Sequence, residues 1–163
     1  MNTFSKLVLV ACAVSVMLGS QSFSETLKTG PKFVLKDVSG KTISSKSFKG
    51  KIVVLNFWAT WCPPCVGEIP YLVALQKKYE KQGVQVVGVS MDEDQSGVPA
   101  FVKAHSMGFP VLYATPKLQK DLGGIRSIPT TYILDRNFKI VEKLMGYHDL
   151  EGFEKVIVPL LKK

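Results

Sequence analysis

The chain carries the run Ile52-Val53-Val54-Leu55-Asn56-Phe57-Trp58 and, after Ala59-Thr60-Trp61, the motif Cys62-Pro63-Pro64-Cys65. The run is almost entirely apolar and rich in β-branched residues, which predicts a buried β-strand. From Pro63 to Lys81 apolar residues recur at helical spacing, and proline suits the first position of a helix. The positive end of a helix favours a thiolate over a neutral thiol. The motif therefore predicts two neighbouring thiols that can close a disulfide or resolve a mixed one.

Length and charge limit the classes of function. A chain of 163 residues with 46% hydrophobic residues predicts one domain with a substantial core. The formal net charge is +8, and the lysines are spread along the chain without an Arg-rich run. This pattern favours a solvated basic surface, with attraction to an anionic membrane or an acidic partner as the weaker alternative. Nucleic-acid binding has little support.

Residues 1–24 have the pattern of a signal peptide. Lys6 precedes an apolar stretch over residues 7–18, and small residues follow at 19–22. The stretch is shorter than the roughly 20 residues of a membrane span, so we expect cleavage near residues 20–24 and a periplasmic domain over residues 25–163. Two alternatives are an uncleaved anchor and lipidation at Cys12. Without the leader only Cys62 and Cys65 remain, which favours redox chemistry over structural disulfides.

The rest of the chain alternates between strand and helix patterns. Apolar segments predict a hairpin over residues 33–43, strands over 84–89, 109–113, 130–134 and 139–144, and helices over 98–105, 117–122 and 150–161. The acidic stretch 92–97 is expected to be a solvated loop, its resemblance to a calcium site being weak. Strands joined first by helices and later by a hairpin predict an α/β sandwich with a mixed sheet.

The motif around the cysteines, with Pro70 and Ile128-Pro129-Thr130, resembles the thioredoxin superfamily. More narrowly, residues 31–161 resemble the exported TlpA-like thiol-disulfide oxidoreductases, including those of cytochrome c maturation. The resemblance implies a thioredoxin fold, which is a three-layer α/β sandwich with a mixed central sheet. It also implies an N-terminal hairpin and a central αβ insertion filled by residues 91–115.

The resemblance also implies roles for the residues of the motif. Cys62 would be the exposed attacking thiol, and Cys65, one turn further on, the more buried resolving thiol. Glu68 would move the proton of thiol exchange, with a pKa raised by burial. Thioredoxins use a buried aspartate six residues before the first cysteine, where this chain has Asn56. The alternative for Glu68 is an exposed acid in the first turns of the helix, where the helix dipole stabilises its negative charge.

A surface for partner proteins is expected around the cysteines. The resemblance implies a cis peptide bond between Ile128 and Pro129, which would expose the Ile128 backbone to a substrate strand. Trp61, Pro63 and Pro64 would complete this surface. Pro64 has no N–H group, so one amide that could stabilise a Cys62 thiolate is missing. We therefore expect a moderately lowered Cys62 pKa and a reducing protein.

We predict a periplasmic enzyme that reduces disulfides of partner proteins through Cys62 and Cys65, without a bound cofactor or metal. Its partners would be a disulfide-bearing protein, with apocytochrome c as one candidate, and an upstream membrane dithiol that reduces the Cys62–Cys65 disulfide again. The protein is expected to be a monomer. One alternative is a thiol peroxidase, although Ala59 stands where that class has threonine. The other is a metallochaperone or a redox-gated binding protein. Structural zinc needs four ligands, and no second Cys-x-x-Cys motif exists.

Overall fold

The computed structural model describes residues 29–162. The expected signal peptide, its cleavage region and Cys12 lie outside these residues. The strands are β1 (Val34–Lys36), β2 (Thr42–Ser44), β3 (Ile52–Trp58), β4 (Val84–Ser90), β5 (Val111–Tyr113), β6 (Thr130–Leu134) and β7 (Ile140–Met145). The helices are α1 (Pro63–Tyr79), α2 (Val98–Ala104), α3 (Pro116–Asp121) and α4 (Leu150–Leu161), with the short 3-10 helices η1 (Ser45–Phe48) and η2 (Glu80–Gln82).

The main sheet is mixed and has the strand order β5-β4-β3-β6-β7. Strand β4 runs parallel to β3 and β5 parallel to β4, whereas β6 and β7 are antiparallel to their neighbours. The central strand β3 is buried at all seven positions, as its continuous apolar run predicts. It ends four residues before Cys62 and so delivers the motif to one edge of the sheet.

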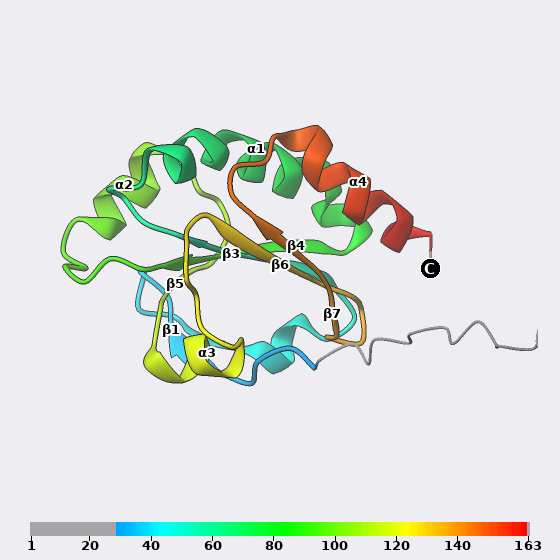
Figure 1. Ribbon diagram of the computed structural model, residues 1–163, viewed down its shortest axis with the longest axis horizontal. Coiled ribbons are helices and arrows are strands. Elements are labelled where there is room, and N and C mark those ends of the chain that lie inside the picture. Colours follow the sequence, from blue (N-terminus) through cyan, green and yellow to red (C-terminus); the bar gives the residue numbers. More distant parts are fainter. Residues whose placement is uncertain (1–28, 163) are drawn as a thin grey trace, which may run out of the picture.

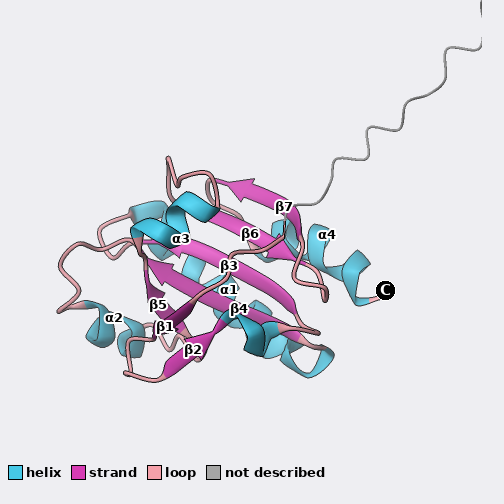
Figure 2. Ribbon diagram, turned by 90° about the horizontal axis from the view of Figure 1, so that it is seen from below, coloured by secondary structure: helices cyan, strands magenta, loops and turns pink. Residues whose placement is uncertain are grey.

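Three layers are visible in Figure 1, with α1, α2 and α4 on one face of the sheet and α3 and the β1–β2 hairpin on the other. Figure 2, viewed from below, shows α3 and the hairpin in front of the sheet. The α/β thioredoxin fold is therefore confirmed, together with the N-terminal hairpin. The hairpin is antiparallel, with Leu35 opposite Ile43.

The segment 91–115 forms the expected insertion and contributes α2 and β5. Strand β5 begins at Val111 instead of Phe109, because Pro110 has no N–H group to donate to the sheet. The Pro110 carbonyl still accepts a hydrogen bond from the Gly88 N–H at 2.9 Å. The Val38 N–H donates to the Val111 carbonyl at 2.9 Å, which joins the hairpin to this edge.

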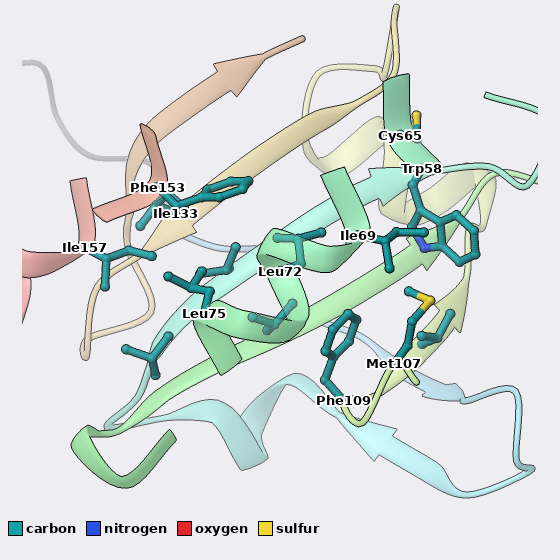
Figure 3. Packing of buried hydrophobic residues seen from close by; sticks show 14 of the residues in the cluster. Trp58, Cys65, Ile69, Leu72, Leu75, Met107, Phe109, Ile133, Phe153 and Ile157 are labelled. Carbon is teal, nitrogen blue, oxygen red and sulfur yellow. The ribbon is translucent and has the colours of Figure 1, made fainter. Parts of the chain in front are cut away.

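The two faces of β3 build two hydrophobic clusters. Ile52, Val54 and Trp58 pack beneath α1 and α4, whereas Val53 and Leu55 face the hairpin layer. This division follows from the alternation of side chains along a strand. Figure 3 shows the first cluster, where Leu72 and Leu75 of α1 lie beside Ile133 and residues of α4. Each such leucine stabilises the fold by roughly 1.5–3 kcal/mol relative to an exposed one.

Helix α1 presents one buried stripe to the sheet. Its members are the adjacent Glu68 and Ile69 and, at further steps of three or four residues, Cys65, Leu72, Leu75 and Tyr79. A carboxyl group thus shares the apolar stripe with the second cysteine. The alternative in which Glu68 is an exposed helix acid is wrong, because position 68 faces the sheet.

Over the segment that the structure describes, no helix combines the length and apolar character that crossing a membrane requires.

Candidate redox site

The two cysteines form a disulfide at the start of α1. The S–S distance is 2.04 Å and the Cα atoms lie 5.3 Å apart. Cys62 is the N-cap residue, and Pro63 and Pro64 occupy the first helical positions. The Cys62 carbonyl accepts a hydrogen bond from the Val66 N–H at 3.0 Å, which closes the first turn. The thiols are therefore held as neighbours by the geometry of one helical turn.

The two prolines reduce the number of amides at this helix end. Neither ring nitrogen carries a hydrogen, so of the first three helical residues only Cys65 has an N–H group. A thiolate at Cys62 would be stabilised by that amide and by the helix field. A moderately stabilised Cys62 thiolate stays a prediction.

Cys62 is not exposed, which corrects the sequence-based expectation. Its exposed fraction is 4%, against 1% for Cys65. The reason is the loop before β6, whose Ile128 carbonyl oxygen lies 3.9 Å from the Cys62 Sγ. The side chain of Trp61 is 67% exposed, and Pro63 and Pro64 are also exposed.

The peptide bond between Ile128 and Pro129 is cis, as expected from the resemblance. Ile128 is half-buried and Pro129 is buried. The Pro129 carbonyl accepts a hydrogen bond from the Gly146 N–H at 2.9 Å. The Thr130 hydroxyl donates to the Ser127 carbonyl at 2.7 Å, which fixes the loop from its other side. Gly146 thus packs against the backbone of the loop that covers the disulfide.

Glu68 is completely buried and holds two hydrogen bonds. The backbone N–H of His148 donates to its Oε1 at 2.9 Å, and the Asn56 Nδ2 donates to its Oε2 at 2.8 Å. Burial raises the pKa of Glu68 from 4.5 to about 7, because the charged form loses solvation, and both hydrogen bonds oppose this shift. The carboxyl group can therefore take up or release a proton near neutral pH.

Asn56 occupies the place of the thioredoxin aspartate and acts on Glu68 through its amide. Its Nδ2 also donates to the Thr131 Oγ1 at 2.9 Å. Asn56 and Thr131 lie opposite each other on the paired strands β3 and β6. The sheet register therefore orients the amide toward Glu68. The titratable group has moved from the strand to the helix, where it follows Cys65 by one turn.

Asp92 is buried, which contradicts the expectation of a wholly solvated acidic loop. Its Oδ1 accepts hydrogen bonds from the Thr60 hydroxyl at 2.6 Å and from the Thr60 N–H at 3.1 Å. Its Oδ2 accepts from the Ser90 hydroxyl at 2.8 Å. The carboxylate is buried because it supplies acceptors for the turn between β3 and Cys62. Glu93 and Asp94 remain exposed.

The described residues contain no group of three or more His, Cys, Asp or Glu side chains that could hold a metal ion. His105 stacks on Phe101 with ring centroids 3.9 Å apart. The ring Nδ1 of His148 lies 2.9 Å from the Gly146 carbonyl.

Three residues of this site escape sequence reasoning. His148 contributes through its backbone N–H, which no side-chain pattern can reveal. The sequence shows that Asn56 replaces the thioredoxin aspartate, but it does not predict the hydrogen bond from Asn56 to Glu68. Asp92 lies among acids that indicate a solvated loop. Asp92 and His148 reach the site from segments far from the cysteine motif in sequence, whereas Asn56 lies on the strand directly before it.

Comparison with known proteins places these features among related chains. Residues 27–143 match the model of the AhpC/TSA family. The thiol-disulfide oxidoreductase ResA of Bacillus thuringiensis is 42% identical over 137 residues, which cover 81% of this chain and 78% of that protein.

Two solved structures from Chlorobium tepidum are similar. One, a thiol:disulfide interchange protein of the thioredoxin family, has a TM-score of 0.78 at 34% identity and covers 83% of this chain and 97% of its own. The other, a putative thiol:disulfide interchange protein DsbE, has a TM-score of 0.76 at 30% identity, with coverages of 83% and 96%.

Proposed function

Because the chain belongs to the AhpC/TSA family and is a thiol-disulfide oxidoreductase of the ResA and DsbE type, we propose that it is an exported, periplasmic reductant of disulfides in partner proteins. The observation that carries the proposal is the buried Glu68 on the same helical stripe as Cys65, with a pKa of about 7. A disulfide with a purely structural role does not need a neighbouring group that exchanges protons near neutral pH. The paired prolines support the reducing direction, since they leave the thiolate with few donors.

The first step is the attack of the Cys62 thiolate on a sulfur of the partner disulfide. A mixed disulfide forms between Cys62 and that sulfur, and the other partner sulfur leaves as a thiolate that takes a proton. The partner approaches along Trp61, Pro63 and Pro64, and its backbone pairs with Ile128. The buried Pro129 fixes the cis bond that turns the Ile128 carbonyl toward Cys62.

The second step releases the reduced partner. The Cys65 thiol gives its proton to the Glu68 carboxylate and attacks the Cys62 sulfur. The Cys62–Cys65 disulfide forms, and the second partner sulfur leaves as a thiolate that is then protonated. Two electrons have passed from the dithiol to the partner, and no cofactor takes part.

The cycle needs a second dithiol to return the enzyme to its reduced form. We assign this role to an upstream membrane dithiol protein, reached after export by the signal in residues 1–24. The disulfide-bearing substrate is a protein, with apocytochrome c as one candidate of the cytochrome c maturation route, and the enzyme acts as a monomer. The single surface around Trp61 and Ile128 serves both partners in turn.

Trapping the mixed disulfide tests this proposal. Cys65→Ala should accumulate a partner joined through Cys62, because the resolving thiol is missing, and Cys62→Ala should trap nothing. Non-reducing electrophoresis with mass spectrometry of the exported fraction reads out both variants. Captured chains that are released by reductant identify the substrate.

Three results would contradict the proposal. Equal trapping by Cys62→Ala would show that Cys62 is not the attacking thiol. Turnover of hydrogen peroxide by the reduced protein, without exchange on a model protein disulfide, would assign it to thiol peroxidases instead. Stoichiometric metal lost in Cys62→Ser would favour a metallochaperone.

A further inference from the structure

The N-terminal part of the described chain carries an uneven charge. Residues 29–51 contain one acid, Asp37, and six lysines, namely Lys32, Lys36, Lys41, Lys46, Lys49 and Lys51. The Asp37 carboxylate is engaged locally, because its Oδ1 accepts hydrogen bonds from the N–H groups of Ser39 and Lys41 at 2.9 Å. This segment, the hairpin layer, concentrates positive charge on the face opposite α1 and α4.

A cavity of about 390 Å³ opens in this layer. Phe33, Val34 and Phe138 contribute apolar wall, and Lys32, Lys46 and Lys49 stand beside them. Val34 is 67% exposed, so its side chain is accessible at the rim of the cavity. We call these six residues the basic pocket. Its composition, apolar wall with ammonium groups beside it, complements a molecule with a negative head and an apolar body.

The chain enters the structure at this pocket. Thr29 lies in its wall, and the apolar stretch of residues 7–18 precedes it by ten residues. In the alternative with an uncleaved anchor, these ten residues span at most about 35 Å when extended and would keep the pocket near the bilayer surface. With a cleaved leader, the positive charge and the apolar wall of the pocket point to the same partner by themselves.

The pocket and the disulfide lie at opposite ends of the central strand. The turn that contributes Phe138 adjoins the start of β3, where Leu134 lies opposite Val53 and the Gly50 N–H donates to the Arg136 carbonyl. Cys62 follows the other end of β3, and a strand of seven residues extends over roughly 23 Å. A surface that covers the pocket therefore leaves the disulfide free for partners.

We propose that the basic pocket docks the protein on an anionic lipid bilayer, with the three lysines at the headgroups and Val34 at the level of the upper acyl chains. The inference rests on the proposed export, which brings the protein to a membrane surface. A free phosphate would use the lysines but not the apolar wall. The orientation presents Trp61 and the disulfide away from the lipid.

Lysine footprinting on the full-length chain tests the proposal. The protein is mixed with excess vesicles of phosphatidylcholine, or of phosphatidylcholine with about one third phosphatidylglycerol, and acetylation of each lysine is followed by mass spectrometry. Labelling of Lys32, Lys46 and Lys49 should slow several-fold on the anionic vesicles only. Labelling of exposed Lys77 and Lys81 on the opposite layer should not change. Salt of about 0.5 M should abolish the protection.

A pair of triple variants separates the pocket from net charge. Lys32→Glu/Lys46→Glu/Lys49→Glu should lower the ratio of binding to anionic over neutral vesicles by at least about 100-fold, since each lysine lost near an anionic surface removes roughly a factor of five and each glutamate adds repulsion. The matched variant Lys77→Glu/Lys81→Glu/Lys162→Glu makes the same charge change and should lower it far less. Any contribution of the leader that is equal on both lipids cancels in this ratio.

Three outcomes would overturn the inference. The first is an equal labelling rate of Lys32, Lys46 and Lys49 on both kinds of vesicle. The second is an equal loss of the binding ratio in the two triple variants. The third is slow labelling of these lysines even when no vesicles are present. The last result would assign the pocket to another segment or copy of this chain. Exchange with a model protein disulfide is measured in the same samples. Exchange without lipid protection refutes only this inference, and lipid protection without exchange refutes only the proposed function.

Discussion

Glu68→Gln should make the stability of the protein much less dependent on pH. In the folded protein the pKa of Glu68 is about 7, whereas the ordinary value of 4.5 applies in the unfolded chain. At pH values between 4.5 and 7, Glu68 is protonated in the folded chain and ionised in the unfolded chain. The contribution of Glu68 to stability is therefore fully present below pH 4.5 and is lost as the pH rises through 7.

The size of the effect follows from the two pKa values. They differ by about 2.5 units, and each unit is worth 1.36 kcal/mol, so the free energy of unfolding should fall by about 3 kcal/mol between roughly pH 4 and pH 8. Glutamine has nearly the same shape and cannot ionise. It can accept from the His148 N–H and, if the Asn56 amide turns over, donate to the Asn56 oxygen, so the fold should survive.

Denaturant unfolding of the disulfide form measures this difference. The free energy of unfolding of the natural protein should decline relative to Glu68→Gln across the stated range. The control is Glu80→Gln, an exposed acid just beyond the same helix, which should follow the natural protein. Thiol–disulfide exchange by Glu68→Gln should be slower near neutral pH and lack the inflection near pH 7. Parallel stability curves and an unchanged pH–rate profile would remove Glu68 from the mechanism.

Three further variants probe the surroundings of the disulfide and the core. Asn56→Leu removes a donor to the Glu68 carboxylate, so the pKa of Glu68 should rise further and the inflection of the exchange rate should move to higher pH; an unmoved inflection would refute the amide contact. Asp92→Ala leaves the N–H and hydroxyl of Thr60 without their acceptor and should cost about 1–3 kcal/mol in denaturant unfolding, with partial recovery in Asp92→Asn. Leu72→Ala empties a fully buried site and should cost about 2–5 kcal/mol by the same measurement, and a loss below about 1 kcal/mol would contradict the packing of α1 on the sheet.

Local sequence patterns predict much of this fold. The apolar run 52–58 specifies a buried strand, and Cys62-Pro63-Pro64-Cys65 specifies a helix start with two adjacent thiols. The three-residue step from Cys65 to Glu68 places both on one helical stripe, because that spacing is close to one turn. These features depend on neighbours within a few residues, so the order of residues alone determines them.

The surroundings of the disulfide depend on contacts between residues far apart in the chain. Sheet register brings Asn56 beside Thr131, and the turn after β7 brings the His148 N–H to Glu68 across 80 positions. The approach of Ile128 to Cys62 buries a sulfur that the motif alone suggests is exposed. The sequence by itself determined which groups carry the chemistry, while the tertiary structure decided the burial and the hydrogen bonds of Glu68. The reason is that desolvation is set by everything packed around a group, and no local pattern encodes it.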